Sequence, residues 1–214
     1  MNKFILFTLG RTASTSTFNC IFNSLKADSP TALGIDRGIY ERHEWQQFND
    51  ASHSVFTFFN ATKVKKLQEE LKDHSEWCLL LVSRKDFAAW LLSNGSYNTT
   101  NKSHPGKDYV IKNLAFNKEQ FMLAYWNYKC WEKAVYEQAD TFDFGRVIRI
   151  DFDDLISDWS GAGKLINNWD WTNTEALMEL GPTTSWQAVE NIDEVLSWIP
   201  TDDQQLIDNI KKQL

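Results

Sequence analysis

The chain has 214 residues, a length typical of one domain, and its composition is that of a folded globular protein. Hydrophobic residues make up 43% of the chain and charged residues 24%, whereas only 9 glycines and 4 prolines are present. These values exclude a disordered, collagen-like or low-complexity chain. The net charge of -7 disfavours nucleic acid and anionic lipid as partners, because an acidic surface repels their phosphates. A local basic pocket for one small anion is still compatible with that charge.

The three cysteines, Cys20, Cys78 and Cys130, show neither the spacing of a metal site nor a disulfide framework. We therefore expect buried thiols in a reducing compartment. The apolar run at residues 4–7 is too short for a signal sequence, and no segment approaches the roughly 20 apolar residues of a membrane span. The sequence thus predicts a cytoplasmic protein with no membrane partner.

The first half of the chain alternates between patterns typical of strands and of helices. Continuous apolar runs predict strands at residues 4–9, 55–59 and 77–82, whereas apolar residues at helical spacing predict helices at residues 14–25 and 62–71. The run at 77–82 is the most apolar of these and predicts a strand buried on both faces.

The second half continues the alternation. Helical spacing resumes at Phe87, and the polar segment Gly95–Lys107 then predicts an exposed loop. Asn117 and Gln120 form a capping box before a long helix, residues 147–150 predict another strand, and Thr201 with Gln204 opens a last helix. Alternating strands and helices predict an α/β fold in which helices flank a central parallel β-sheet, all within a single domain spanning residues 1–214.

The first chemical signal is the segment that follows the first predicted strand. Gly10 and Arg11 are followed by a run of small and hydroxyl residues, Thr12, Ala13, Ser14, Thr15, Ser16 and Thr17. Backbone N–H groups and the dipole at the start of a helix favour an anion, and Arg11 adds a forked, charge-assisted contact. An ordinary helix cap in a hydroxyl-rich turn is the alternative. This segment lacks the second glycine of the ATP-binding P-loop and its lysine followed by Ser or Thr, which disfavours a magnesium-dependent nucleotide triphosphatase.

A second segment, Ser83–Asp86, follows the strand at 77–82, and the two segments together resemble the sulfotransferase superfamily. In that family, a loop of proline, a basic residue, serine, glycine and threonine holds the donor, 3′-phosphoadenosine-5′-phosphosulfate (PAPS). Residues 11–15 take its place here, with Gly10 in place of the proline and Ala13 in place of the glycine. The second family signature is a strand-end arginine with a serine eight or nine residues later, which Arg84 and Ser93 match.

Residues 147–155 are similar to a late strand of the same family, where the feature is structural. The resemblance covers residues 4–165 and is closest to the bacterial carbohydrate and trehalose-type branch; residues 166–214 are expected to form a helical C-terminal part. It implies a P-loop-like, three-layer domain that moves a sulfuryl group from PAPS to a hydroxyl of a small acceptor, with a carbohydrate as one candidate. The transfer is an in-line displacement that needs no metal. The residues that it assigns to PAPS are Gly10, Arg11, Thr12, Ala13, Ser14, Thr15, Ser16, Arg84 and Ser93.

The catalytic groups implied are Arg11, which would stabilise the leaving phosphate, and a base for the acceptor hydroxyl. The segment Gly38–Trp45 contains both residue types that the family uses as the base. Glu41 is the first candidate, His43 the second and Glu44 the third. A kinase with a P-loop-like site and a non-catalytic module that binds adenine nucleotides are the alternative functions. The sequence indicates no particular oligomeric state.

Overall fold

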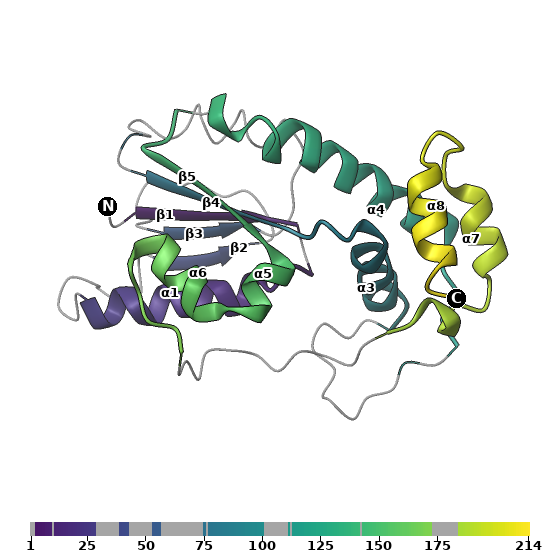
Figure 1. Cartoon of the computed structure of the whole chain (residues 1–214), viewed down its shortest axis with the longest axis horizontal. Coiled ribbons are helices and arrows are strands. Elements are labelled where there is room, and N and C mark those ends of the chain that lie inside the picture. Colours follow the sequence, from purple (N-terminus) through teal and green to yellow (C-terminus); the bar gives the residue numbers. More distant parts are fainter. Residues whose placement is uncertain are drawn as a thin grey trace. The chain divides into compact units, whose positions relative to one another are not determined.

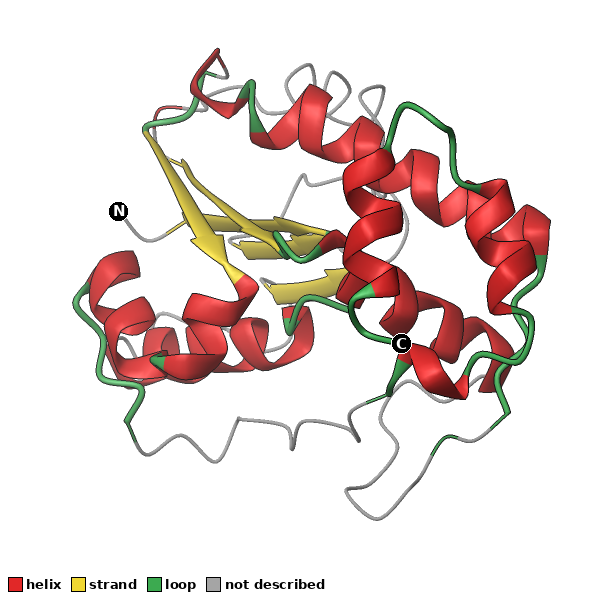
Figure 2. Cartoon of the chain, turned by 45° about the vertical axis from the view of Figure 1, so that its right-hand side comes forward, coloured by secondary structure: helices red, strands yellow, loops and turns green. Residues whose placement is uncertain are grey.

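The computed structural model describes residues 3–9, 11–28, 39–42, 53–56, 75, 77–100, 111, 113–141, 143–172 and 184–214. They form a mixed α/β structure with a parallel sheet flanked by helices (Figure 1), and Figure 2 separates its strands, in yellow, from its helices, in red. The chain divides into two compact units, Met1–Lys85 with Lys129–Met178, and Asp86–Tyr128 with Glu179–Leu214. None of the helices in the described residues is long and apolar enough to span a bilayer.

The first unit contains a sheet of five parallel strands in the order β2-β3-β1-β4-β5. Their bounds are β1 (Lys3–Thr8), β2 (Ile39–Arg42), β3 (His53–Phe56), β4 (Trp77–Ser83) and β5 (Arg146–Asp151). Every residue of β4 is buried, because this strand is central and both of its faces are covered. The apolar patterns correctly predicted strands at β1, β4 and β5; the strand predicted at residues 55–59 overlaps β3 only at residues 55–56, and β2 was not predicted.

Three helices of the first unit lie on the same side of the sheet (Figure 1): α1 (Ser14–Asp28), α5 (Phe152–Ser157) and α6 (Trp159–Asn167). Alternate strand residues face them, as the two-residue period of a strand requires. The resulting core comprises Phe4, Leu6, Cys20, Ile21, Cys78, Leu80, Val82, Ile148, Ile150, Leu155, Ala162, Ile166, Trp169 and Trp171. Burial of the Cys78 thiol raises its pKa to about 11.

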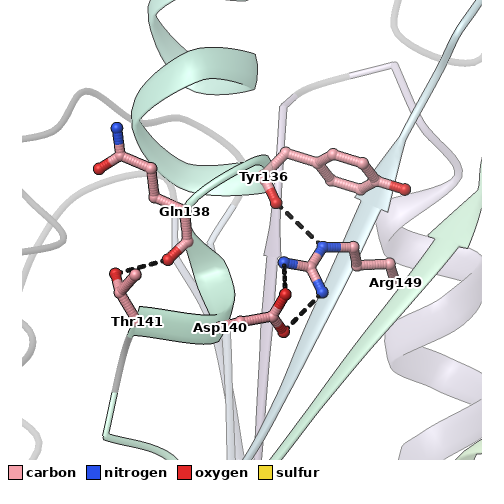
Figure 3. Close-up of polar contacts among 5 residues, drawn as sticks. All are labelled: Tyr136, Gln138, Asp140, Thr141 and Arg149. Carbon is pink, nitrogen blue, oxygen red and sulfur yellow. Dashed lines mark hydrogen bonds and ion pairs between the residues drawn. The ribbon is translucent and has the colours of Figure 1, made fainter.

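The π-helix η2 (Glu132–Tyr136) contacts β4, and the 3₁₀-helix η3 (Ala139–Thr141) follows it. Arg149 of β5 holds the two together (Figure 3): its guanidinium forms two hydrogen bonds to Asp140, at 2.8 and 2.9 Å, and its Nε donates to the carbonyl of Tyr136 at 2.9 Å. The guanidinium lowers the pKa of Asp140. This forked contact fixes the end of the irregular helix.

The second unit is helical, with α3 (Phe87–Thr100), most of α4 (Lys118–Trp131), η4 (Trp186–Ala188), α7 (Ile192–Trp198) and α8 (Gln204–Lys211). Side chains far apart in the sequence tie it together. Asn191 bonds both backbone groups of Phe116, at 3.0 and 2.9 Å, and the hydroxyl of Tyr125 donates to Asp203 at 2.9 Å. Burial and the Asp203 carboxylate raise the pKa of Tyr125.

The structure corrects the loop predicted at Gly95–Lys107. Helix α3 continues to Thr100, so residues 95–100 are helical, whereas residues 101–107 lie outside the described part of the chain. A Cβ on Gly95 would lie 2.6 Å from the ring of Phe116, so this glycine permits close packing inside a helix instead of ending it.

Two further predictions are wrong, and a third concerns residues that the structure does not describe. Helix α8 begins at Gln204 rather than near Thr201, because Asp203 N donates to Pro200 O in a turn that precedes the helix. Cys130 is exposed rather than buried. The helix predicted at residues 62–71 lies outside the described residues. Asn117 is confirmed as the cap of α4, since its side chain accepts from the N–H of Gln120 at 3.1 Å.

Candidate functional site

Strands β1 and β4 are parallel neighbours, so the chain leaves both at the same end of the sheet, but it continues from them to strands on opposite sides of this pair. The helix after β1 leads toward β2 on one side, whereas β4 is followed along the sheet by β5 on the other. Open parallel sheets bind ligands at such a reversal, outside the carboxyl ends of the strands. Thr8 is in register with Val82, and its hydroxyl donates to the Val82 carbonyl at 3.0 Å. The segments that follow β1 and β4 therefore start side by side.

The loop after β1 has an unusual backbone. Arg11 and Ala13 adopt left-handed conformations, with φ of 68° and 57°. Residues in this conformation turn backbone N–H groups inward and are found in anion-binding loops. Thr12, between them, is fully buried, and its hydroxyl donates to Leu9 O at 2.7 Å and contacts the hydroxyl of Thr8. The Thr12 side chain thus shapes the loop from inside.

Helix α1 begins at the end of this loop. The N–H groups of Ser14, Thr15 and Ser16 belong to its first turn, where a helix offers donors that have no intrahelical partner. No acidic residue lies in that turn, so nothing there opposes an anion electrostatically. Both the N–H and the hydroxyl of Thr17 donate to Ala13 O at 2.9 Å, which fastens the loop to the helix.

The exit of β4 contains a buried hydroxyl followed by two cations. Ser83 is 6% exposed, and among the described residues its Oγ has no hydrogen-bond partner. Arg84 is half-buried, and its guanidinium carbon lies 4.5 Å above the centre of the Phe152 ring. Lys85 is exposed, with its Nζ 3.9 Å from Asp151 Oδ2. Cationic and hydroxyl donors therefore gather where β4 ends.

Asp151, at the end of β5, fastens this exit to its neighbour. One of its carboxylate oxygens accepts from the backbone N–H of Lys85 at 3.2 Å, and the other caps α5 by accepting from Asp153 N at 2.9 Å. The side chain is buried. Asp86, next along the chain, caps α3 through the N–H of Ala89 at 2.9 Å, so it serves the helix start.

The remaining predicted residues are placed as follows. Glu41 lies in β2, in register with Val55 of β3. Because the strands are parallel, β2 ends at the same end of the sheet as β1 and β4. Gly10, His43 and Glu44 lie outside the described residues. Ser93 lies in α3, in the second unit, and its pairing with Arg84 stays a prediction.

The sequence analysis missed three residues at this site: Ser83 as a donor, and Asp151 and Phe152 as supports of the β4 exit. Ser83 carried a detectable signal, because it is the one polar residue that ends an otherwise apolar strand. The contact between Arg84 and Phe152 depends on the pairing of β4 with β5, which no local pattern encodes.

No group of three or more His, Cys, Asp or Glu side chains in the described part of the chain is arranged to hold a metal ion. A comparison with models of known protein families finds no match, and a search of curated proteins finds no similar sequence.

Proposed function

We propose that the protein is a sulfotransferase that moves a sulfuryl group from PAPS to a hydroxyl of a small acceptor. The observation that carries this proposal is the adjacency of β1 and β4, since it brings together the starts of the two segments that resemble the donor-binding signatures of the family. A site with two arginines and a helix start suits a ligand with two separate phosphate groups.

The residues present suit such a donor chemically. The left-handed turn at Arg11 and Ala13 and the first turn of α1 offer backbone N–H groups to a phosphosulfate. The guanidinium of Arg84 suits the second phosphate, and Ser83 Oγ is a buried hydroxyl that has no partner among the described residues. A buried hydroxyl without a partner costs stability, so its presence beside Arg84 supports a bound polar group.

Each residue has a defined task in this proposal. When bound, PAPS supplies the sulfuryl group and an adenosine bisphosphate leaving group. Arg11 and the N–H groups of Ala13, Ser14, Thr15 and Ser16 would stabilise negative charge on the leaving phosphate. Arg84 and Ser93 would hold the other phosphate. A side-chain base, Glu41 first and His43 or Glu44 as alternatives, would accept the proton of the acceptor hydroxyl.

The proposal includes a P-loop-like three-layer arrangement, a single functional domain formed by both units, and transfer without a metal. It also includes a cytoplasmic location, which the three cysteines, all present as thiols, support. The acceptor would be a small hydroxyl compound, with a carbohydrate as one candidate.

Thermal unfolding with added nucleotides tests the proposal. Adenosine 3′,5′-bisphosphate should raise the melting temperature by several degrees at millimolar concentration, because a ligand that binds only the folded state stabilises it by mass action. ATP with magnesium is the control. Stabilisation by ATP-magnesium alone would reject the proposal in favour of a kinase, and stabilisation by the bisphosphate without transfer of ³⁵S-labelled sulfuryl to any acceptor would favour a binding module.

A further inference from the structure

We infer that Phe152 is a positioning residue for Arg84, which it holds ready for an anionic ligand at the exit of β4. The inference rests on the proposed function. The guanidinium carbon of Arg84 lies 4.5 Å from the centre of the Phe152 ring. At this distance the negative face of the ring attracts the cation.

The backbone on both sides of this contact is fixed. Phe152 begins α5, whose first turn is capped by Asp151, and the ring is buried. The same Asp151 carboxylate accepts from the N–H of Lys85, the residue after Arg84. One carboxylate therefore fixes the peptide that follows Arg84 and the helix that presents the ring. The register of Ser83 with Asp151 sets this alignment.

The physical benefit of the contact lies in the side chain of Arg84. A free arginine side chain has many rotamers, and a ligand that binds it must stop this motion at a cost in entropy. Contact with a fixed ring limits the motion before the ligand arrives, and an arginine whose orientation is already limited loses less entropy when it makes a forked contact with an oxyanion. Phe152 would thus act on the ligand only through Arg84.

The first unit contains a matched pair for comparison. Arg149 lies over the ring of Tyr136, with its guanidinium carbon 5.7 Å from the ring centre, but its donors are directed to Asp140 and to the Tyr136 carbonyl (Figure 3). Tyr136→Leu removes an arginine–aromatic contact of the same kind in the same unit and leaves Arg84 and Phe152 in place.

Calorimetric titration of the full chain with adenosine 3′,5′-bisphosphate tests the inference. Phe152→Leu should weaken binding by about three- to tenfold, as loss of a cation–π contact implies, whereas Phe152→Tyr and Tyr136→Leu should bind as the wild type does. In an Arg84→Ala background, Phe152→Leu should cause no further loss, because a positioning residue has nothing left to position. Equal binding by Phe152→Leu and the wild type, or an equal loss in the Arg84→Ala background, would overturn the inference.

A measurement without ligand separates this inference from the proposed function. The ¹⁵Nε–¹Hε resonance of Arg84, assigned by its loss in Arg84→Ala, should be ordered on the nanosecond timescale in the wild type and mobile in Phe152→Leu. An unchanged Arg84 resonance in a folded Phe152→Leu protein overturns the inference, whatever the result of the titration with the bisphosphate. A wild type that does not bind the bisphosphate, but whose Arg84 resonance responds to Phe152→Leu, overturns the function alone.

Discussion

At the residue scale, the loop after β1 depends on backbone conformations that side chains disfavour. Ala13 has φ of 57°, in the left-handed region where a Cβ is strained, yet its methyl group packs against the core of the first unit. The sulfotransferase superfamily, which residues 11–15 resemble, has glycine at this position, and glycine is the residue best suited to that conformation. The strain at Ala13 is therefore consistent with a loop shape retained for its N–H groups.

Replacing Ala13 with glycine should stabilise the protein by up to about 1 kcal/mol. The left-handed conformation costs alanine about 1–2 kcal/mol, which exceeds the roughly 0.8 kcal/mol from one buried methyl group. Urea unfolding gives the comparison. The control is Ala89→Gly in α3, which should lose up to about 1 kcal/mol through helix propensity. An equal loss in both variants would show that Ala13 is unstrained.

Ser83 provides a second residue-scale prediction. Ser83→Ala should leave the free energy of unfolding without ligand unchanged or raise it by up to about 1 kcal/mol, because the hydroxyl has no partner among the described residues. Binding of adenosine 3′,5′-bisphosphate should weaken at the same time. Thr8→Val is the comparison: it removes a hydroxyl bonded to Val82 O and should cost about 1 kcal/mol. A loss of stability in Ser83→Ala as large as in Thr8→Val would contradict this interpretation.

At the scale of elements, α3 shows why composition alone misplaced a boundary. Glycine and polar residues predicted a loop from Gly95, but the glycine serves the approach of Phe116, whose backbone Asn191 holds in place. The packing partner is distant in the sequence, so the local pattern could not reveal it. The local pattern also failed to predict β2, because this four-residue edge strand forms through its pairing with β3.

Gly95→Ala should destabilise the second unit by about 1–3 kcal/mol, although alanine is the better helix former, because the new Cβ overlaps the Phe116 ring. Chemical unfolding followed by circular dichroism measures the loss. Phe116→Leu should reduce the effect of Gly95→Ala in the double variant, because a smaller side chain leaves space for the methyl group. Additive losses in that cycle would show that the two residues do not act on each other.

At the scale of the whole molecule, the apolar runs were sufficient to predict the α/β class, because buried parallel strands need continuous apolar sequence. They also predicted the two strand ends with Arg11 and Arg84. The chain divides into two compact units at three places, and one of them falls within α4, where helical periodicity continues without a break. The supports around Arg84 were missed because they arise from strand order.

The sheet core also predicts how stability depends on pH. Burial raises the pKa of Cys78 from 9.0 to about 11, so the folded protein keeps a proton that the unfolded chain loses above pH 9. The free energy of unfolding should therefore fall as pH rises from 9 to 11, by about 2 kcal/mol from this thiol. Cys78→Ala should show a shallower decline in urea unfolding across this range. Identical slopes would exclude the contribution.

Binding of two nucleotides that differ by one phosphate tests the central claim, that the exits of β1 and β4 hold two separate phosphate groups. Titration calorimetry should show that the wild type binds adenosine 3′,5′-bisphosphate more tightly than adenosine 5′-monophosphate. Arg84→Ala should weaken binding of the bisphosphate by about 10- to 100-fold and leave binding of the monophosphate unchanged, whereas Arg11→Ala should weaken binding of both nucleotides. Equal affinity of the wild type for the two nucleotides, or an equal loss of both in Arg84→Ala, would contradict the account.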